Sequence, residues 1–246
     1  MKGIVLAGGI GSRLFPLTKA TNKTLLPIGR FPMIYYPIMN MKQCGITEIM
    51  IVTNQLHIGD FASVFGSGSE YGVHIVYAVQ EKALGIVDAL KEARDFSYGD
   101  SMMLFLGDCI FEKPIHYFHT AYVQKQNGKG ARVLLYEVPD PERFGVATIE
   151  GDLITEIEEK PKYPKSNFAV VGAYLYDQTA WDKIPHITPS ARGEYEITSL
   201  NNMYIQERSM QYDVVQGKWF DAGTFQTLLD AGSVMMEVYD NSQKDL

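Results

Sequence analysis

The hydrophobic and polar positions along the first 138 residues follow two alternating patterns. Short runs of consecutive apolar residues, typical of strands buried on both faces, occur at 2–8, 48–54, 74–80, 102–108 and 132–138. Between these runs, apolar residues recur with helical spacing at 32–44, 59–65, 84–95 and 114–126. Strands that alternate with helices predict an α/β fold with a mostly parallel, Rossmann-like sheet. We expect helices on both faces of this sheet and right-handed connections.

The pattern changes after residue 138. Residues 144–161 alternate with a period of two around Glu150, Gly151 and Asp152, which predicts a β-hairpin, and residues 169–177 predict another strand. Helical spacing follows at 195–207 and 224–240, with a strand at 210–216 between them. We therefore expect one domain over 1–246, made of a larger lobe at about 1–138, a smaller β-rich lobe at about 139–223 and a C-terminal helix at 224–246.

Composition narrows the class of protein. A chain of 246 residues with 46% hydrophobic and 21% charged residues is typical of a globular α/β protein. Its net charge of −7 argues against a nucleic-acid surface, so any anion site must be local. Met1 is not followed by a signal peptide or a membrane-spanning run, which predicts a cytoplasmic protein. Cys44 and Cys109 are expected to be reduced, buried thiols.

The segment after the first predicted strand, LAGGIGSRLFPLTKATNKTLLP at 6–27, combines glycines with cations. A dinucleotide fingerprint would need a third glycine where Leu14 stands, and a G-x-x-x-x-G-K-[ST] phosphate loop is absent. A tight turn without a ligand would leave Arg13, Lys19 and Lys23 as solvated surface cations. Alternatively, backbone N–H groups together with Arg13 and Lys23 would form a cradle for a polyphosphate. In either interpretation Lys19 stays at the surface.

Several motifs resemble one enzyme family. Residues 6–38 resemble the signature of the sugar-phosphate nucleotidyltransferases, and the similarity continues through LGD (106–108), DPERFGV (140–146), EEKPKYPKSNFAVVG (158–172), SARGEYEIT (190–198) and WFDAGT (219–224). The resemblance implies the nucleotide-diphospho-sugar transferase fold, with a nucleotide-binding first lobe and a second lobe that binds a sugar phosphate. Within this family, the chain most resembles a short form of the members that transfer a thymidylyl group from dTTP to α-D-glucose 1-phosphate.

The resemblance also implies the chemistry. The sugar phosphate attacks the α-phosphorus in line, pyrophosphate leaves, and Mg²⁺ is the cofactor, so no Ser/His/Asp nucleophile set is required. The product would supply deoxysugar or surface-polysaccharide synthesis, and the protein would be a homo-oligomer, either a dimer or a tetramer. Two alternatives stay open: the same reaction with UTP or another sugar 1-phosphate, or a non-catalytic nucleotide-sugar-binding subunit with a regulatory or scaffold role.

Four residues are the expected catalytic set. Arg13 would clamp the leaving pyrophosphate, and Lys23 would contact the α-phosphate as charge develops. Asp108, at the end of a predicted strand, and Asp221, in WFDAGT, would supply hard oxygen ligands to Mg²⁺. Joint retention of these four residues favours an enzyme over a scaffold.

The expected binding residues also follow from the resemblance. For the nucleotide they are Leu6, Gly8, Gly9, Gly11, Arg13, Lys23, Gln80, Gly85 and Asp108. For the sugar phosphate they are Gly145, Glu159, Lys160, Val171, Arg192 and Trp219. Because neighbouring strand residues point to opposite sides, Glu159 and Lys160 can share a pocket only if the strand bends. Asp88 stands where Gln or Glu is usual, and Val171 where Thr is usual.

Two remaining features carry weaker expectations. His116 and His119 share a predicted helical face, but without a third ligand nearby they are expected on a solvated surface and not in a metal site. Longer relatives carry an additional helical tail that is associated with feedback regulation. The chain ends soon after the helix at 224–240, so we expect that regulatory site to be reduced or missing.

Overall fold

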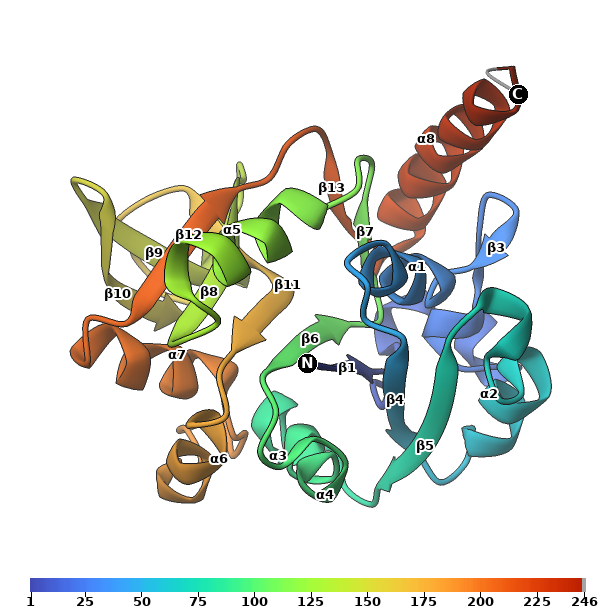
Figure 1. Ribbon diagram of the computed structural model, residues 1–246. Helices are drawn as coiled ribbons and strands as arrows, with labels where there is room; N and C mark the ends of the chain where they lie inside the picture. The colour runs from blue at the N-terminus through green and yellow to red at the C-terminus, as the bar shows by residue number, and fades with distance from the viewer. Residues whose placement is uncertain (245–246) are drawn as a thin grey trace.

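The computed structural model describes residues 1–244 and contains a nine-stranded mixed sheet between two layers of helices (Figure 1). The sheet has the order β10-β9-β11-β6-β1-β4-β5, and β8 and β12 extend it from β11. Its strands are β1 (Lys2–Leu6), β4 (Glu48–Asn54), β5 (His74–Gln80), β6 (Met102–Leu106), β8 (Ala131–Glu137), β9 (Gly145–Glu150), β10 (Leu153–Glu159), β11 (Phe168–Tyr176) and β12 (Met210–Val214).

The expected fold class is confirmed, with one difference in the sheet. Strands β6, β1, β4 and β5 pair in parallel, so their carboxyl ends share one edge. Strand β8 does not join this parallel set directly, because β11 lies between β8 and β6 and is antiparallel to both. The hairpin of β9 and β10 is present, but its burial does not follow a strict period of two, because the register shifts between Ile154 and Glu156 and the buried residues of β10, Ile154 and Ile157, lie three positions apart.

The strand β11 joins the two lobes. One edge of it pairs with β8 from Phe168 to Tyr176. On the other edge, its second half pairs with β6, while Ala169 near its start pairs with Val146 of β9. The ladder is interrupted at Gly172, where a Cβ atom would lie 2.4 Å from the sulfur of Cys109. The small residue thus lets β11 pass close to the end of β6.

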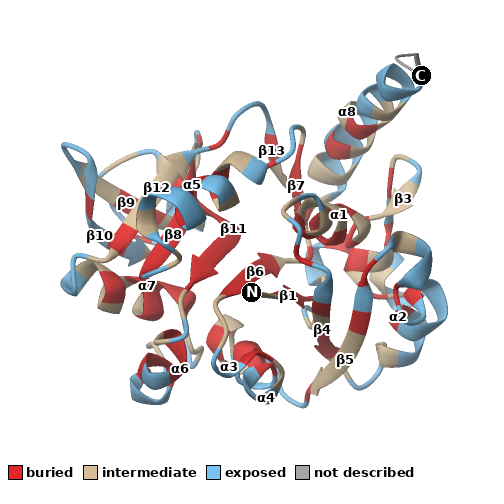
Figure 2. Ribbon diagram, in the orientation of Figure 1, coloured by how far each residue is buried: buried red, intermediate tan, exposed pale blue. Residues whose placement is uncertain are grey.

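The helices cover both faces of the sheet, and Figure 2 shows β6 and β11, in the middle of it, as largely buried. One face packs against α1 (Tyr35–Gln43), α2 (Ile58–Phe65) and α5 (His116–Gln126). The other packs against α3 (Ile86–Lys91), α6 (Ala180–Lys183) and α7 (Ile197–Gln206). Consecutive residues of β1 divide between the faces, Val5 on the first and Ile4 on the second, which explains why the buried strands are continuously apolar.

The single helix expected over 84–95 is wrong in its extent. The chain forms α3 and a separate α4 (Arg94–Ser97), because Ala93 leaves helical geometry at φ −93° and ψ 4°. Gly85, at φ +106°, precedes α3 and gives the sharp entry that only glycine adopts readily. The helix α3 therefore begins directly beside the carboxyl end of β5.

Two small sheets flank the main one. β2 (Pro27–Ile28) pairs with β3 (Phe31–Pro32), and β7 (Cys109–Phe111) pairs with β13 (Trp219–Asp221). The long helix α8 (Phe225–Lys244) follows β13 and extends beyond the body of the molecule (Figure 1). None of the described helices combines the length and the apolar character of a membrane span.

Candidate functional site

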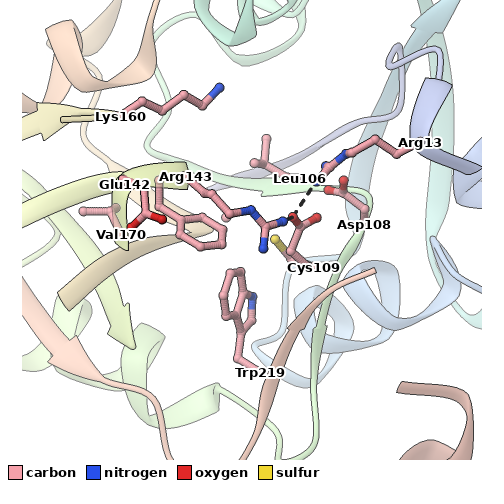
Figure 3. Close-up of a pocket in the computed structure, with 12 residues that line it drawn as sticks. Arg13, Leu106, Asp108, Cys109, Glu142, Arg143, Lys160, Val170 and Trp219 are labelled. Atoms are coloured by element: carbon pink, nitrogen blue, oxygen red, sulfur yellow. Dashed lines mark ion pairs between the residues drawn. The ribbon is translucent and has the colours of Figure 1, made fainter. Parts of the chain in front are cut away.

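Three adjoining cavities lie at the carboxyl ends of the parallel strands, and Leu106, at the end of β6, lines all three. The largest, of about 600 Å³, contains Arg13, Asp108, Arg143, Trp219 and Asp221 (Figure 3). We call it the phosphate cavity, and name the other two likewise, after the ligands that the family resemblance leads us to expect there. A second of about 270 Å³, the base cavity, is bounded by Gln80 and the turn after β1. A third of about 170 Å³, the sugar cavity, lies in the second lobe.

The glycine-rich turn packs against the side chain of Lys23. Gly11 has φ +64°, and a Cβ atom there would lie 2.8 Å from the Cβ of Lys23 and from a methyl group of Thr18. Gly9 lies against the same lysine stem, at 3.4 Å for a Cβ atom. Gly11 is therefore a support of Lys23 and lines none of the three cavities. Lys19 is exposed, and its side chain forms no hydrogen bond or ion pair among the described residues, as expected for a surface cation.

Lys23 and Asp108 form a buried ion pair in the middle of the site. Burial by itself raises the pKa of Asp108, but the adjacent Lys23 ammonium outweighs it and holds that pKa below its usual value. Burial likewise disfavours the charged lysine, yet Asp108 raises the pKa of Lys23. Both groups are therefore ionised at neutral pH.

The second carboxylate, Asp221, reaches the same place through the pairing of β13 with β7. Asp221 lies opposite Cys109, and the N–H of Ala222 donates to the carbonyl of Asp108 at 3.0 Å. Burial and the negative charge of Asp108 raise the pKa of Asp221. An arginine from each lobe partly offsets this effect: Arg13 approaches one oxygen of Asp221 at 3.6 Å and Arg143 at 3.8 Å.

The two carboxylates suit a divalent cation. Burial and the negative charge of Asp108 raise the pKa of Asp221, and a cation between the two carboxylates would relieve their repulsion. Within residues 1–244 no group of three or more His, Cys, Asp or Glu side chains could enclose a metal. The pair therefore fits a hard cation such as Mg²⁺ that takes its remaining ligands from water and substrate oxygens, as Mg²⁺ commonly does.

The base cavity brings together most of the expected nucleotide residues. Leu6, Gly8, Gly9, Lys23, Gln80, Gly85 and Asp108 all line it. The side chain of Gln80 is buried, and its amide nitrogen donates to the carbonyl of Gly85 at 3.3 Å. Gly8 leaves room for this side chain, because a Cβ atom there would lie 3.0 Å from the amide oxygen of Gln80. Arg13, in contrast, lines only the phosphate cavity.

Glu159 and Lys160 lie on the same side of their strand, as a shared pocket requires. The strand β10 ends at Glu159, and Lys160 has a φ of +46°. This left-handed conformation turns the Lys160 ammonium to within 3.9 Å of the Glu159 carboxylate. Thr198, at the start of α7, donates to Glu159 at 2.6 Å. Glu159, Lys160 and Gly145 line the sugar cavity, which supports the expected bend.

Three expected sugar-phosphate residues are placed differently. Val171 is buried in the core against the α1, α2 and α5 layer, and its neighbour Val170 lines the cavities, because consecutive strand residues face opposite sides. The expected place of Val171 beside the sugar is therefore not found. Arg192 lines none of the three cavities and is held by carboxylates, with one nitrogen 2.8 Å from Glu196 and 3.7 Å from Glu159. Trp219 lines the phosphate cavity instead of the sugar cavity.

The structure brings three residues to the site that were not predicted from the sequence: Arg143, Phe144 and Gly223. Arg143 and Phe144 line both the phosphate and the sugar cavities. Gly223 permits the approach of Arg13, because a Cβ atom at this position would lie 2.6 Å from the guanidinium and 3.0 Å from Asp221. These residues belong to the motifs DPERFGV and WFDAGT, so the family resemblance could have pointed to them.

The remaining cysteine and histidine expectations have mixed outcomes. Both cysteines are free, and Cys109 is buried, but Cys44 is only partly buried. His116 and His119 belong to no metal cluster among the described residues. Cys109 lines the phosphate cavity next to Asp108, and burial raises the pKa of its thiol, so that it stays protonated.

Comparison with known proteins gives a consistent result. Residues 2–237 match the family described as nucleotidyl transferase. A glucose-1-phosphate thymidylyltransferase of Neisseria meningitidis is 40% identical over 242 residues, which cover 97% of this chain and 83% of the relative. The enzyme of that name from Mycolicibacterium smegmatis is 37% identical over 97% of this chain and 83% of its own.

Solved structures show the same relationship. A Bacillus anthracis protein assigned as a glucose-1-phosphate thymidylyltransferase, in complex with sucrose, is 51% identical and superposes with a TM-score of 0.89, covering 96% of this chain and 95% of the other. A UDP-glucose pyrophosphorylase in complex with UDP-glucose has a TM-score of 0.84 at 20% identity, covering 96% of this chain and 98% of the other. At that identity the second structure supports the fold alone.

Proposed function

Because the chain belongs to the nucleotidyl transferase family, we propose that it transfers a thymidylyl group from dTTP to α-D-glucose 1-phosphate and releases pyrophosphate. One observation carries the proposal: the Lys23–Asp108 pair, Asp221 and Arg13 meet between a cavity bounded by Gln80 and a cavity bounded by Glu159. A scaffold protein has no need to bury two repelling carboxylates at such a junction.

The proposed reaction is an in-line displacement. The phosphate of the sugar is already an anion at neutral pH, so the protein does not have to generate a nucleophile. Its task is to reduce repulsion between two polyanions, and fixed cations in a partly buried site are effective there. Lys23 would contact the α-phosphate, where negative charge builds up in the transition state. Arg13 would hold the leaving pyrophosphate through its guanidinium donors.

Asp108 and Asp221 would hold Mg²⁺, which when bound supplies positive charge to the phosphate oxygens. Arg13 and Arg143 both approach Asp221, and each guanidinium would be able to turn to phosphate oxygens once the carboxylate has another partner, which supports this assignment.

In the second lobe, Glu159 would accept hydrogen bonds from sugar hydroxyl groups, and Lys160 would hold the phosphate of glucose 1-phosphate. Thr198 donates to one oxygen of Glu159, and the other oxygen, which forms no hydrogen bond among the described residues, faces Lys160 and Arg192 at 3.9 and 3.7 Å. Arg192 lines none of the three cavities and would act through Glu159.

Finer features of the proposal rest on the family resemblance. We place the enzyme in the cytoplasm, with dTDP-glucose going to deoxysugar and polysaccharide synthesis such as the dTDP-rhamnose route. We also propose a homo-oligomer, a dimer or a tetramer; the exposed apolar side chains of Phe225 and Leu229 on α8 support it. Light scattering coupled to size-exclusion chromatography would test the oligomeric state.

The test of the reaction is a pyrophosphate-release assay with dTTP, UTP, dCTP and ATP at fixed glucose 1-phosphate and Mg²⁺. Thymine and uracil differ by one methyl group, whose burial is worth about 0.8 kcal/mol, and pockets extract limited discrimination from such a group. We expect kcat/KM for UTP to be about 10- to 100-fold below that for dTTP. Highest activity with dCTP or ATP, or none with any triphosphate, would contradict the proposal.

A second assay tests the route. Labelled dTTP incubated without a sugar phosphate should leave no acid-stable label on the protein, because the displacement is direct. Stoichiometric labelling would require a ping-pong route and a nucleophile that the site does not provide.

A further inference from the structure

The carboxamide of Gln80 is held by two neighbours on one side. Its nitrogen, Nε2, lies 2.9 Å from a carboxylate oxygen of Asp88 and 3.3 Å from the carbonyl oxygen of Gly85. Only 7% of the Gln80 residue is exposed. The side chain is therefore fixed within the wall of the base cavity.

The two neighbours determine which end of the amide faces the ligand. A carboxylate and a carbonyl can only accept hydrogen bonds, so each can pair with the NH₂ group of Gln80 but not with its C=O. The oxygen Oε1 must then point the other way. It faces Gly8, since a Cβ atom on that glycine would lie 3.0 Å from it. Within residues 1–244, no donor forms a hydrogen bond with Oε1.

Asp88 is itself held in place. It lies in the first turn of α3, where a carboxylate is favoured by the helix dipole. Its second oxygen is 4.0 Å from the ammonium of Lys91, which lies 3.9 Å from the centre of the Tyr195 ring. The backbone of Tyr195 in turn bonds to Leu84 on one side of Gly85 and to Val87 on the other. This network connects α3 to the loop before α7.

We propose that Asp88 is a positioning residue that selects the nucleobase: by binding the NH₂ group of Gln80 it commits the carbonyl oxygen of that amide to the base. An acceptor that has no donor among the described residues matches a base edge with an N–H donor, which is the N3–H of thymine or uracil. Cytosine presents an unprotonated N3 at the same place, and two acceptors repel. The inference rests on the proposed function, because it concerns the nucleotide that occupies the base cavity.

With its nitrogen held by Asp88 and Gly85, the amide of Gln80 is restricted to one orientation. A glutamine that could rotate its amide would match either pyrimidine, since it would offer an acceptor to thymine or a donor to cytosine. Asp88 removes the second possibility. Gly85 alone would hold the nitrogen less firmly, because its contact is the longer of the two.

The test measures binding, so it does not depend on turnover. The dissociation constants of dTDP and dCDP would be determined by calorimetry for the intact protein and for D88L and D95N. Leucine has the branching of aspartate but accepts no hydrogen bond. Asp95 is an acidic residue of the neighbouring helix α4 and serves as the matched control.

For the unmodified protein we expect dTDP to bind tighter than dCDP by at least about 100-fold, the range in which unpaired polar groups discriminate. D88L should lower that ratio by about 10-fold or more, because the amide of Gln80 can then rotate. D95N should keep the ratio within about 3-fold, because Asp95 does not contact Gln80. General damage to α3 would weaken both ligands equally and leave the ratio unchanged.

The outcomes separate the inference from the proposed function. An unchanged ratio in D88L, with dTDP preferred by the unmodified protein, would overturn the role of Asp88 and leave the thymidylyl assignment standing. A loss of discrimination in D95N equal to that in D88L would also overturn it, since Asp95 does not contact Gln80. No preference for dTDP in the unmodified protein would contradict the proposed function itself.

Discussion

Lys160 lies beside Glu159 on the same side of the chain, with its ammonium 3.9 Å from the neighbouring carboxylate, because the backbone adopts a left-handed conformation at the lysine. An extended strand would have sent the two side chains to opposite faces. The positive φ of +46° at a residue other than glycine is uncommon, and such conformations concentrate at functional sites.

Replacing Lys160 by glutamine should therefore act on the sugar phosphate. We expect KM for glucose 1-phosphate to rise about 10-fold or more and KM for dTTP to change little, since a charged contact to a phosphate is lost. Lys162 lies just beyond it and lines none of the three cavities, so K162Q is the control. A larger effect of K160Q on the KM for dTTP would contradict this placement.

Replacing Asp221 by asparagine should stabilise the ligand-free protein while abolishing turnover. Burial and Asp108 raise the pKa of Asp221, so ionisation of Asp221 destabilises the folded state. Below the ordinary Asp pKa of about 4 the carboxyl is protonated in both the folded and the unfolded protein, so this destabilisation of the folded state is absent. Above the raised pKa of the folded protein the destabilisation is complete. At pH 8 we expect the melting temperature of D221N to be about 1–3 °C higher.

The same shift predicts how metal binding depends on pH. A divalent cation requires an ionised Asp221, so protons should compete with Mn²⁺ or Mg²⁺ as the pH falls towards the raised pKa. Titration calorimetry at several pH values would show affinity increasing with pH. Affinity that does not vary above pH 4, or a melting temperature of D221N below that of the unmodified protein, would contradict the prediction.

Replacing Lys23 by methionine should lower both stability and activity. It leaves Asp108 buried without its partner, and breaking a buried ion pair in this way typically costs about 3–5 kcal/mol. We also expect kcat to fall by roughly 10²-fold, with a smaller change in KM. The double variant K23M/D108N should regain most of the stability and none of the activity. Recovery of activity in the double variant would show that Lys23 has only a structural role.

Replacing Gly223 by alanine should displace Arg13. The added methyl group would lie 2.6 Å from the guanidinium of Arg13 and 3.0 Å from Asp221, closer than such atoms can approach. We expect kcat/KM to fall by at least about 10-fold with little change in the melting temperature. Gly59 in α2 has open space around it, so G59A is the matched control and should be fully active.

Replacing Arg143 by glutamine should weaken the cooperation between the lobes. Arg143 belongs to the second lobe, yet it approaches Asp221 at 3.8 Å and lines both the phosphate and the sugar cavities. We expect kcat/KM for glucose 1-phosphate to fall about 10- to 100-fold through loss of a phosphate-binding guanidinium. Arg94 stacks on Tyr98 away from the site and provides the control R94Q, which should behave as the unmodified protein.

The parallel strands and their helices could be predicted because each repeats its pattern over several residues. β4 and β5 agree with the apolar runs at both ends, and the glycine turn after β1 lies at the expected edge of the sheet. What periodicity does not specify is which face of a strand borders a cavity. Val171 was expected beside the sugar, but its neighbour Val170 lines the cavity instead. The register shift of β11 that begins at Val171 makes the orientation of these two side chains harder to predict.

The strand pairing that brings the two carboxylates together was not predicted from the sequence, although the strand before Asp108 was. β7 and β13 have three residues each and are separated by more than a hundred positions, so neither shows a recognisable period. Their pairing is a tertiary interaction, and it alone brings Asp221 to Asp108. In the same way, the contact between Gln80 and Asp88 depends on where α3 begins, which the continuous apolar spacing over 84–95 conceals.

The shared strand β11 has a consequence for how the molecule can be divided. Because one strand is hydrogen-bonded both to β6 and β8 of the first lobe and to β9 of the second, neither lobe keeps a complete sheet without it. Fragments made by cutting the chain between β10 and β11 would each expose an unpaired strand edge, which invites aggregation. The two lobes are thus not interchangeable modules that could be transplanted separately. Chimeras with a related enzyme should exchange β11 together with β6 and β8, or leave all three in place.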